Sequence, residues 1–95
     1  MTAIGLLTLH IQLPGCLSLK EKRSRIKPLL ARLQREFNIS VAEVDRLDAW
    51  QESVIALVQV SNDLKHTQQA LQGILRWIET HWPDIQILEN HLEIR

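Results

Sequence analysis

The stretch that decides the fold reads AIGLLTLHIQLPGCLSLKE and spans residues 3–21. Its first part, from Ala3 to Leu13, places Leu7, Leu9 and Ile11 on one side of an extended chain and further apolar residues on the other. Such a segment is typical of a central β-strand with one fully apolar face. The Pro-Gly pair that follows ends the strand.

The second part of the stretch predicts the start of a helix. Ser18 and Glu21 have the spacing of a capping box. In this motif the serine oxygen accepts from a free amide of the first turn, and the glutamate side chain accepts from the backbone N–H of the capping residue. Pro28 points away from the apolar side of this helix, so we expect a kink on the solvent side. One apolar stripe follows the cap: Ile26, Leu29, Leu30, Leu33 and Phe37.

The remainder of the chain predicts two more strands, a second helix and a last strand. Strands over residues 38–44 and 53–60 form a hairpin. Ser61, Asn62 and Asp63 are N-cap candidates for the second helix, which ends at Pro83. A final strand over residues 84–94 changes parity near Leu88, which predicts a bulge there. The second helix has its own apolar stripe: Leu64, Leu71, Ile74, Leu75 and Ile78.

This order of elements, β-α-β-β-α-β, predicts an α+β fold of the ferredoxin-like type. It is a two-layer sandwich, in which an antiparallel sheet with strand order 4-1-3-2 carries both helices on one face. The chain has 95 residues, which is enough for one core and too few for two, so we expect a single domain over residues 1–95.

Composition narrows the class of protein further. The net charge is zero, and 45% of the residues are hydrophobic, as in an ordinary globular domain. No apolar run is long enough to cross a membrane and no signal peptide is evident, so we expect a cytoplasmic protein without a membrane partner. The single cysteine, Cys16, forms no internal disulfide and agrees with a reducing compartment.

The zero net charge hides an uneven distribution. Residues 20–36 hold seven basic and two acidic side chains, whereas the rest of the chain holds four basic and nine acidic ones. Basic side chains in the first turn of a helix oppose the helix dipole, and such local conflicts are typical of functional sites. The candidate site for nucleic acid or another anion consists of Lys20, Lys22, Arg23, Arg25, Lys27 and Trp50.

The predicted topology brings this helix start to one end of the sheet. The loop 14–18, the turn 45–50 and the corner 81–84 should all be its neighbours. Two alternatives to RNA binding remain: the acidic turn (Glu43, Asp45, Asp48) neutralises the basic helix, or the basic helix binds an acidic protein. Trp50 either stacks on a base or partner, or covers the end of the core.

The face of the sheet opposite the helices is the second candidate surface. We assign Ile4, Leu6, Thr8 and His10 to this face, beside alternate residues of the strand 53–60. Such an apolar patch is larger than a monomer usually exposes, so it predicts a homo-oligomer or another protein partner. The candidate interface consists of Ile4, Leu6, Thr8, Ile55 and Leu57.

No catalytic motif is present. Phosphate-binding glycine loops, HExxH, paired CxxC and GxSxG patterns do not occur, so we expect no enzyme. Antiparallel pairing is expected to put His10 and His91 toward opposite ends of their strands, so we expect no metal and no cofactor. RNA-recognition modules stack bases on aromatic residues of the two middle strands, and these strands carry none here.

Three motifs together resemble the YlxP-like family of small bacterial proteins. They are GCLSLKEKRS at residues 15–24, SVAEVD at residues 40–45 with DAWQ at residues 48–51, and VSND at residues 60–63. The resemblance runs along essentially the whole chain and implies a ferredoxin-like fold and a bacterial source. It implies no activity. In some bacteria the family's genes lie among translation and ribosome-maturation factors, which favours RNA or a ribosomal particle as a partner.

Overall fold

The computed structural model describes all residues 1–95 and contains four strands and two helices. In chain order these are β1 (Ala3–Gln12), α1 (Leu19–Glu36), β2 (Ser40–Asp45), β3 (Glu52–Ser61), α2 (Leu64–His81) and β4 (Gln86–Ile94). The expected β-α-β-β-α-β order is confirmed. Neither helix is apolar enough over its length to span a membrane.

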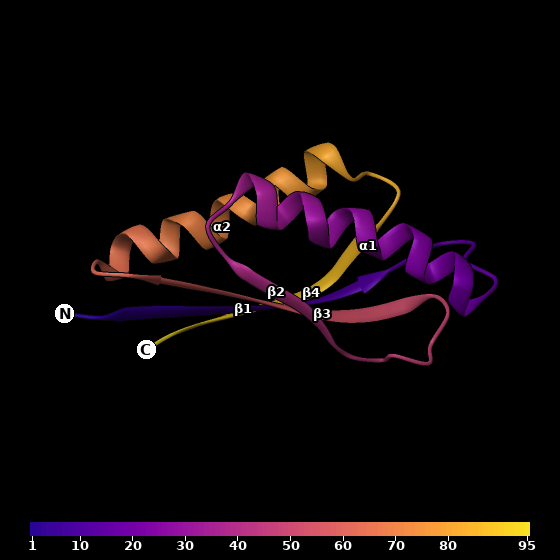
Figure 1. The fold of residues 1–95 in the computed structure, drawn as a ribbon, viewed down its shortest axis with the longest axis horizontal. Coiled ribbons are helices and arrows are strands. Elements are labelled where there is room, and N and C mark those ends of the chain that lie inside the picture. Colours follow the sequence, from indigo (N-terminus) through magenta and orange to yellow (C-terminus); the bar gives the residue numbers. More distant parts are fainter.

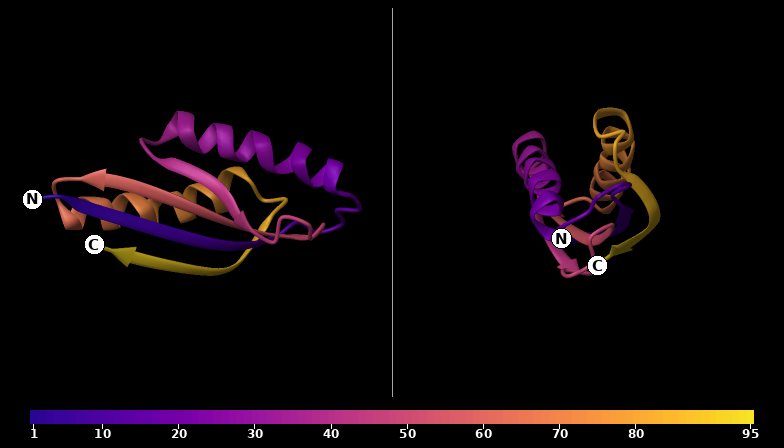
Figure 2. Two further views of the ribbon diagram at one scale, coloured as in Figure 1. Left: turned by 60° about the horizontal axis from the view of Figure 1, so that its bottom comes forward. Right: turned by 90° about the vertical axis from the view of Figure 1, so that its right-hand side faces the viewer.

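The strands form one antiparallel sheet in the order β2-β3-β1-β4, which confirms the predicted 4-1-3-2 arrangement. Figures 1 and 2 show both helices on the same side of this twisted sheet, with the other side left open. The two termini lie together at one end, and the β2–β3 turn and the start of α1 lie at the other (Figure 1). The molecule is thus a two-layer sandwich with one uncovered sheet face.

Local signals in the sequence place the helix starts. The Oγ atom of Ser18 accepts from the Glu21 amide at 3.0 Å, and the Glu21 carboxylate accepts from the Leu17 amide at 2.8 Å. This is the expected capping box, although the returning bond reaches one residue before the cap. Asp63, one of three candidates, caps α2 by accepting from the amides of Lys65 and His66.

Pro28 does not interrupt α1. The helix is continuous from Leu19 to Glu36, and Figure 1 shows no sharp bend in it, so the expected kink is absent. The Pro28 ring is exposed, so the lost backbone hydrogen bond lies on the solvent side of the helix. Water can satisfy the unpaired carbonyl there, which removes one cause of bending.

The core lies between the sheet and the helices, and it corrects one assignment. Ile55 and Leu57 are fully buried in this core, not on the open face. The open-face residues of β3 are Val54, Ala56 and Val58, with Val60 beyond them. Both parities of β3 are apolar, so alternation alone did not distinguish its faces. The larger Ile and Leu side chains fill the space beneath the helices.

The bulge in β4 is confirmed, but the expected separation of two histidines is wrong. His10 pairs with Glu89 and Ile11 with Ile87, so Leu88 is the extra residue. With this register His91 pairs with Thr8, one step along the open face from His10. The two histidines therefore lie near each other, because β4 runs back along the middle of β1.

Candidate functional site

The end of the molecule opposite the termini assembles as expected. The Gln51 side-chain amide donates to the Cys16 carbonyl at 3.2 Å, and the Leu13 amide donates to the Gln51 carbonyl at 2.8 Å. These bonds hold the β2–β3 turn against the loop that follows β1. The predicted neighbourhood of loop 14–18 and turn 45–50 is therefore confirmed.

Arg25 ties the same loop to the end of α2. Its guanidinium donates to the carbonyl oxygens of Pro14 and Asp84, each at 2.9 Å, and lies 3.8 Å from the Asp84 carboxylate. Three segments that are distant in sequence meet at this one side chain. Two hydrogen bonds and one ion pair thus engage Arg25 within the protein, so it holds these segments together and is less free than an unpaired surface cation.

Lys22 occupies a different environment from the one that we predicted. Its side chain is only 2% exposed and lies 2.9 Å from a Glu43 oxygen. Its ammonium also donates to the Arg46 carbonyl at 2.6 Å. A lysine held in this way cannot contact a large ligand at the surface, so its inclusion among the free basic residues is wrong.

Strand β2 and the β2–β3 turn supply the partners that bury Lys22, Glu43 from the strand and the Arg46 carbonyl from the turn. Glu43 Oε2 accepts from both Lys22 and the buried Ser53 hydroxyl, the latter at 2.6 Å. Arg46 has a positive φ of 59°, an unusual backbone conformation for a residue with a side chain. Arg46 is also the residue whose carbonyl oxygen accepts from the Lys22 ammonium. Of the three acidic residues that could neutralise α1, only Glu43 forms an ion pair with it, through Lys22. The other cations of α1 are not neutralised by this turn.

Four cations of α1 have no ion-pair partner and face solvent. Lys22, Arg25 and Arg32 are paired, with Glu43, Asp84 and Glu36 respectively. We call the remaining four, all on the solvent side of α1, the cationic ridge: Lys20, Arg23, Lys27 and Arg35. At 100° per residue they fall within about 120° of one another around the helix axis. Small residues, Ser24 and Ala31, lie between them on the same side.

A pocket of about 250 Å³ opens between α1 and the β2–β3 turn. We call it the ridge pocket, because Arg23 and Lys27 of the cationic ridge line it. Its other polar lining is the Lys22–Glu43 pair. Four apolar side chains complete it: Leu19, Ile26, Leu30 and Leu47.

The capping interactions of Glu21 lower its pKa below the usual value of 4.5. The largest cause is a hydrogen bond from the Cys16 thiol, followed by the Leu17 amide; partial desolvation opposes them, and the Arg25 charge adds to them. The amide at 2.8 Å is the better-defined donor, since the thiol also lies 3.4 Å from the Ser18 carbonyl. Glu21 therefore remains ionised in the first turn of α1, next to Lys20 of the cationic ridge.

The three tryptophans have different surroundings. Trp50 lies in the β2–β3 turn and is 51% exposed. It is therefore not buried over the end of the core, and about half of its surface is accessible. Trp77 and Trp82 are partly buried and pack against the edge of the core. Trp77 also stacks on His81 with ring centroids 4.6 Å apart and lies under Arg32 at 5.6 Å.

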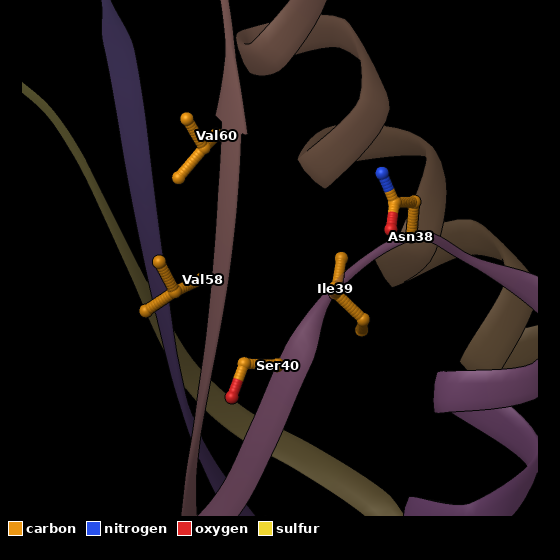
Figure 3. Close-up of a pocket in the computed structure, with 5 residues that line it drawn as sticks. All are labelled: Asn38, Ile39, Ser40, Val58 and Val60. Atoms are coloured by element: carbon orange, nitrogen blue, oxygen red, sulfur yellow. The ribbon is translucent and has the colours of Figure 1, made fainter.

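The open sheet face carries the second candidate surface. Ile4 is 39% exposed and Val60 60% exposed, while Leu6 and Thr8 are half-buried on the same face. A hollow of about 300 Å³ adjoins it, lined by residues 38–40 with Val58 and Val60. Figure 3 shows the two valines extending from the same side of β3. We call the apolar residues of this face the sheet patch: Ile4, Leu6, Val54, Ala56, Val58 and Val60.

A small polar hollow of about 90 Å³ lies beside the sheet patch, between β1 and β4. Thr8, His10, Glu89 and His91 are among its lining residues. His10 pairs with Glu52 at 2.8 Å and His91 with Glu93 at 3.3 Å, so the two imidazoles have separate carboxylate partners. No three metal-ligating side chains gather here or elsewhere in the chain.

The sequence candidates did not include Arg35 of the cationic ridge or the apolar lining of the ridge pocket. Arg35 extends the cationic ridge beyond Lys27, and its position on the helical wheel was a readable signal. Leu47 lines the ridge pocket although it is 59% exposed. An apolar residue in a polar turn was the available sign for Leu47, but its position at the same pocket as α1 depends on the folded turn.

Comparisons with known proteins agree with the fold and leave the activity open. The model of a family described as "Protein of unknown function (DUF503)" matches residues 4–92. The uncharacterized protein YlxP of Bacillus subtilis (strain 168) is 38% identical over 69 residues, which cover 73% of this chain and 74% of that protein. Among solved structures, the de novo designed protein Foldit4 matches with a TM-score of 0.56, covering 100% of this chain and 97% of that one. Its identity of 18% makes this a likeness of fold alone. The chain therefore belongs to the DUF503 family of proteins of unknown function, as its resemblance to YlxP-like proteins indicated.

Proposed function

We propose that this protein is an accessory binder of RNA, free or within a ribosomal particle, and that the cationic ridge of α1 contacts the RNA phosphates. The observation that carries the proposal is the ridge itself. Four cations, Lys20, Arg23, Lys27 and Arg35, have no carboxylate partner in a chain whose net charge is zero. Carboxylates are available nearby and pair with Lys22 and Arg25 instead.

The spacing of the ridge supports contact with a phosphate backbone. Lys20, Arg23 and Lys27 rise along the helix by about 4.5 and 6 Å per step. The small side chains of Ser24 and Ala31 leave room between the cations for a strand of RNA. Phosphate contacts of this kind confer affinity without sequence specificity, and they weaken with salt because bound counterions are released.

The test is RNA binding measured against salt. We expect single-stranded RNA to bind with a slope of log K against log salt of about −2 to −3, since each neutralised phosphate contributes about −0.7. The double variant R23E/K27E should flatten this slope by more than about 1. A matched control, K65E/R76E, makes the same change of charge on exposed residues of α2 and should retain most of the binding.

Three outcomes would contradict RNA binding by the ridge. Absence of affinity at low salt would remove the proposal altogether. Equal losses in R23E/K27E and K65E/R76E would show that general charge is responsible, not the ridge. If capture from cytosol with the tagged protein persists after nuclease treatment and depends on Arg23, an acidic protein is the partner instead.

We also propose that a second copy of this chain covers the sheet patch. The patch is uncharged and lies on the two middle strands, opposite the helices. The adjoining open-face residues of β4 and the residue after it carry both signs of charge: Glu89, His91, Glu93 and Arg95. A two-fold interface brings the same residues of both copies together, so such a mixed rim can be self-complementary.

Sedimentation tests this self-association. We expect a dimer at high micromolar concentration, and we expect V60K to sediment as a monomer because two buried cations would meet at the interface. The control L64K places the same charge on an exposed leucine of α2, on the helix side of the sheet, and should remain dimeric. A wild-type protein that stays monomeric at this concentration would contradict the proposal.

A further inference from the structure

The ridge pocket is built differently from the open surface around it. Its floor contains the buried Lys22 ammonium, fixed by Glu43 Oε2 at 2.9 Å and by the Arg46 carbonyl at 2.6 Å. Its volume is about 250 Å³. This is below the range of roughly 300 to 1,000 Å³ that accommodates drug-sized ligands. A single ring system is therefore the appropriate size of occupant.

The lining combines two kinds of chemistry. Ile26 and Leu30 of α1 face the pocket from the helix, and Leu47 faces it from the β2–β3 turn. Apolar walls on two sides favour a flat ring over a hydrated ion. Arg23 and Lys27, one helical turn apart, line the same pocket without carboxylate partners. The occupant should therefore join a ring to an anionic group.

Glu43 adds a third requirement. Both recorded donors to its carboxylate, Lys22 and the Ser53 hydroxyl, reach Oε2, and Oε1 accepts no hydrogen bond. The side chain is 21% exposed and lines the pocket. A carboxylate oxygen with free acceptor capacity favours a ligand that carries N–H donors. Cytosine, adenine and guanine each carry an exocyclic amino group with two such donors, whereas uracil offers only its single ring N3–H.

We propose that the ridge pocket receives one unpaired base of a single-stranded RNA while Arg23 and Lys27 hold its phosphate. This deepens the RNA-binding proposal above and rests on it. Bases of a duplex are stacked and paired and cannot enter, so binding favours single strands. The Glu43 carboxylate gives a preference for a base with an exocyclic amino group, such as cytosine, over uracil, which has a single N–H donor. The base lies against aliphatic side chains, which distinguishes this site from aromatic stacking platforms.

Three labelled decamers of equal length and charge test the proposal: oligocytidine, oligouridine and an abasic phosphodiester. We expect oligocytidine to bind about tenfold more tightly than the abasic decamer, the effect of burying roughly 60 Å² of apolar surface. Oligouridine should bind more weakly than oligocytidine. All three should show similar salt slopes, because their phosphate contacts are the same.

Two leucine variants, one at the ridge pocket and one away from it, test whether the pocket is responsible for the difference between the decamers. L47S removes one apolar wall and leaves every cation in place; Leu47 is 59% exposed, so its loss should not unfold the protein. We expect L47S to bring oligocytidine close to the abasic affinity without changing the abasic affinity itself. L88S makes the same change at an exposed leucine of β4 and should preserve the tenfold difference.

Any other result contradicts a specific part of the proposal. Equal binding of oligocytidine and the abasic decamer, with a normal salt slope, overturns the base pocket and leaves RNA binding by the ridge intact. Equal affinity for oligocytidine and oligouridine overturns the role of Glu43. No binding of any decamer removes the RNA proposal and this inference together. If a short acidic peptide with a central leucine binds in a Leu47-dependent manner and RNA does not, the pocket recognises a protein.

Discussion

Lys22 shows how strongly one residue depends on partners that are distant in sequence. Its run of neighbours, Lys-Glu-Lys-Arg, is typical of a solvated helix face, yet its side chain is 2% exposed. The buried ammonium is compatible with the fold because Glu43 and the Arg46 carbonyl replace its water. The same arrangement connects the start of α1 to the β2–β3 turn, and so maintains the ridge pocket between them.

A double-mutant cycle measures this connection. We expect K22M to lower the free energy of unfolding by about 2 to 3 kcal/mol and E43Q by about 3 to 5, because each leaves a partner uncompensated. K22M/E43Q should lose less than the sum, with a coupling of about 1 to 3 kcal/mol. Urea unfolding provides the measurement. K20M, at an exposed unpaired lysine, is the control and should have only a small effect on the free energy of unfolding. An effect of K22M as small as that of K20M would refute the buried pair.

At the scale of the element, the start of α1 has a titratable cap. The pKa of Glu21 is lowered from 4.5 by the Cys16 thiol and the Leu17 amide, so its ionised form stabilises the folded state. A lowered folded-state pKa contributes stability that is fully present above the unfolded value and is lost as the pH falls through the folded value. The capping box is therefore an acid-sensitive part of α1.

The variant E21Q tests this pH dependence. We expect wild type to be more stable than E21Q at neutral pH, and the difference in free energy of unfolding to shrink as the pH falls below about 4.5. Denaturant unfolding at neutral pH and near pH 3 is the measurement. A difference that stays constant between the two conditions would show that the carboxylate charge does not support the cap.

Pro28 is the other informative residue of α1 at this scale. It lies exposed inside a continuous helix, where a proline removes one backbone hydrogen bond. We expect P28A to raise the free energy of unfolding by about 1 to 3 kcal/mol, measured by thermal and urea unfolding. P83A, beyond the end of α2, is the control and should bring no such gain. Destabilisation by P28A would mean that the ring makes contacts that its exposure does not suggest.

At the scale of the whole molecule, the sheet separates two surfaces of different character. Helix α1, which carries the cationic ridge, lies on one side of the sheet (Figure 2). The sheet patch is on the other face. Self-association through the patch would leave the ridge of each copy accessible. We therefore expect R23E/K27E to leave sedimentation unchanged, which makes it a second control for the V60K experiment.

Much of the architecture was predictable because the signals are local. The capping residues Ser18 and Asp63 satisfy amides a few positions away, and the change of parity near Leu88 records a bulge within one strand. The strand order then follows from the order of elements. The composition of the candidate site was also partly predictable, since the basic residues of α1 and the turn that meets them are evident in the sequence.

The sequence by itself determined the elements, their order and the end of the molecule where loop, helix start and turn meet. Only the tertiary structure decided which side chains are accessible there. Apolar residues on both parities of β3 left its faces undetermined until the helices covered Ile55 and Leu57. The environment of Lys22 was decided by a turn 24 residues away, because burial of a charge depends on partners that the fold alone brings within bonding distance.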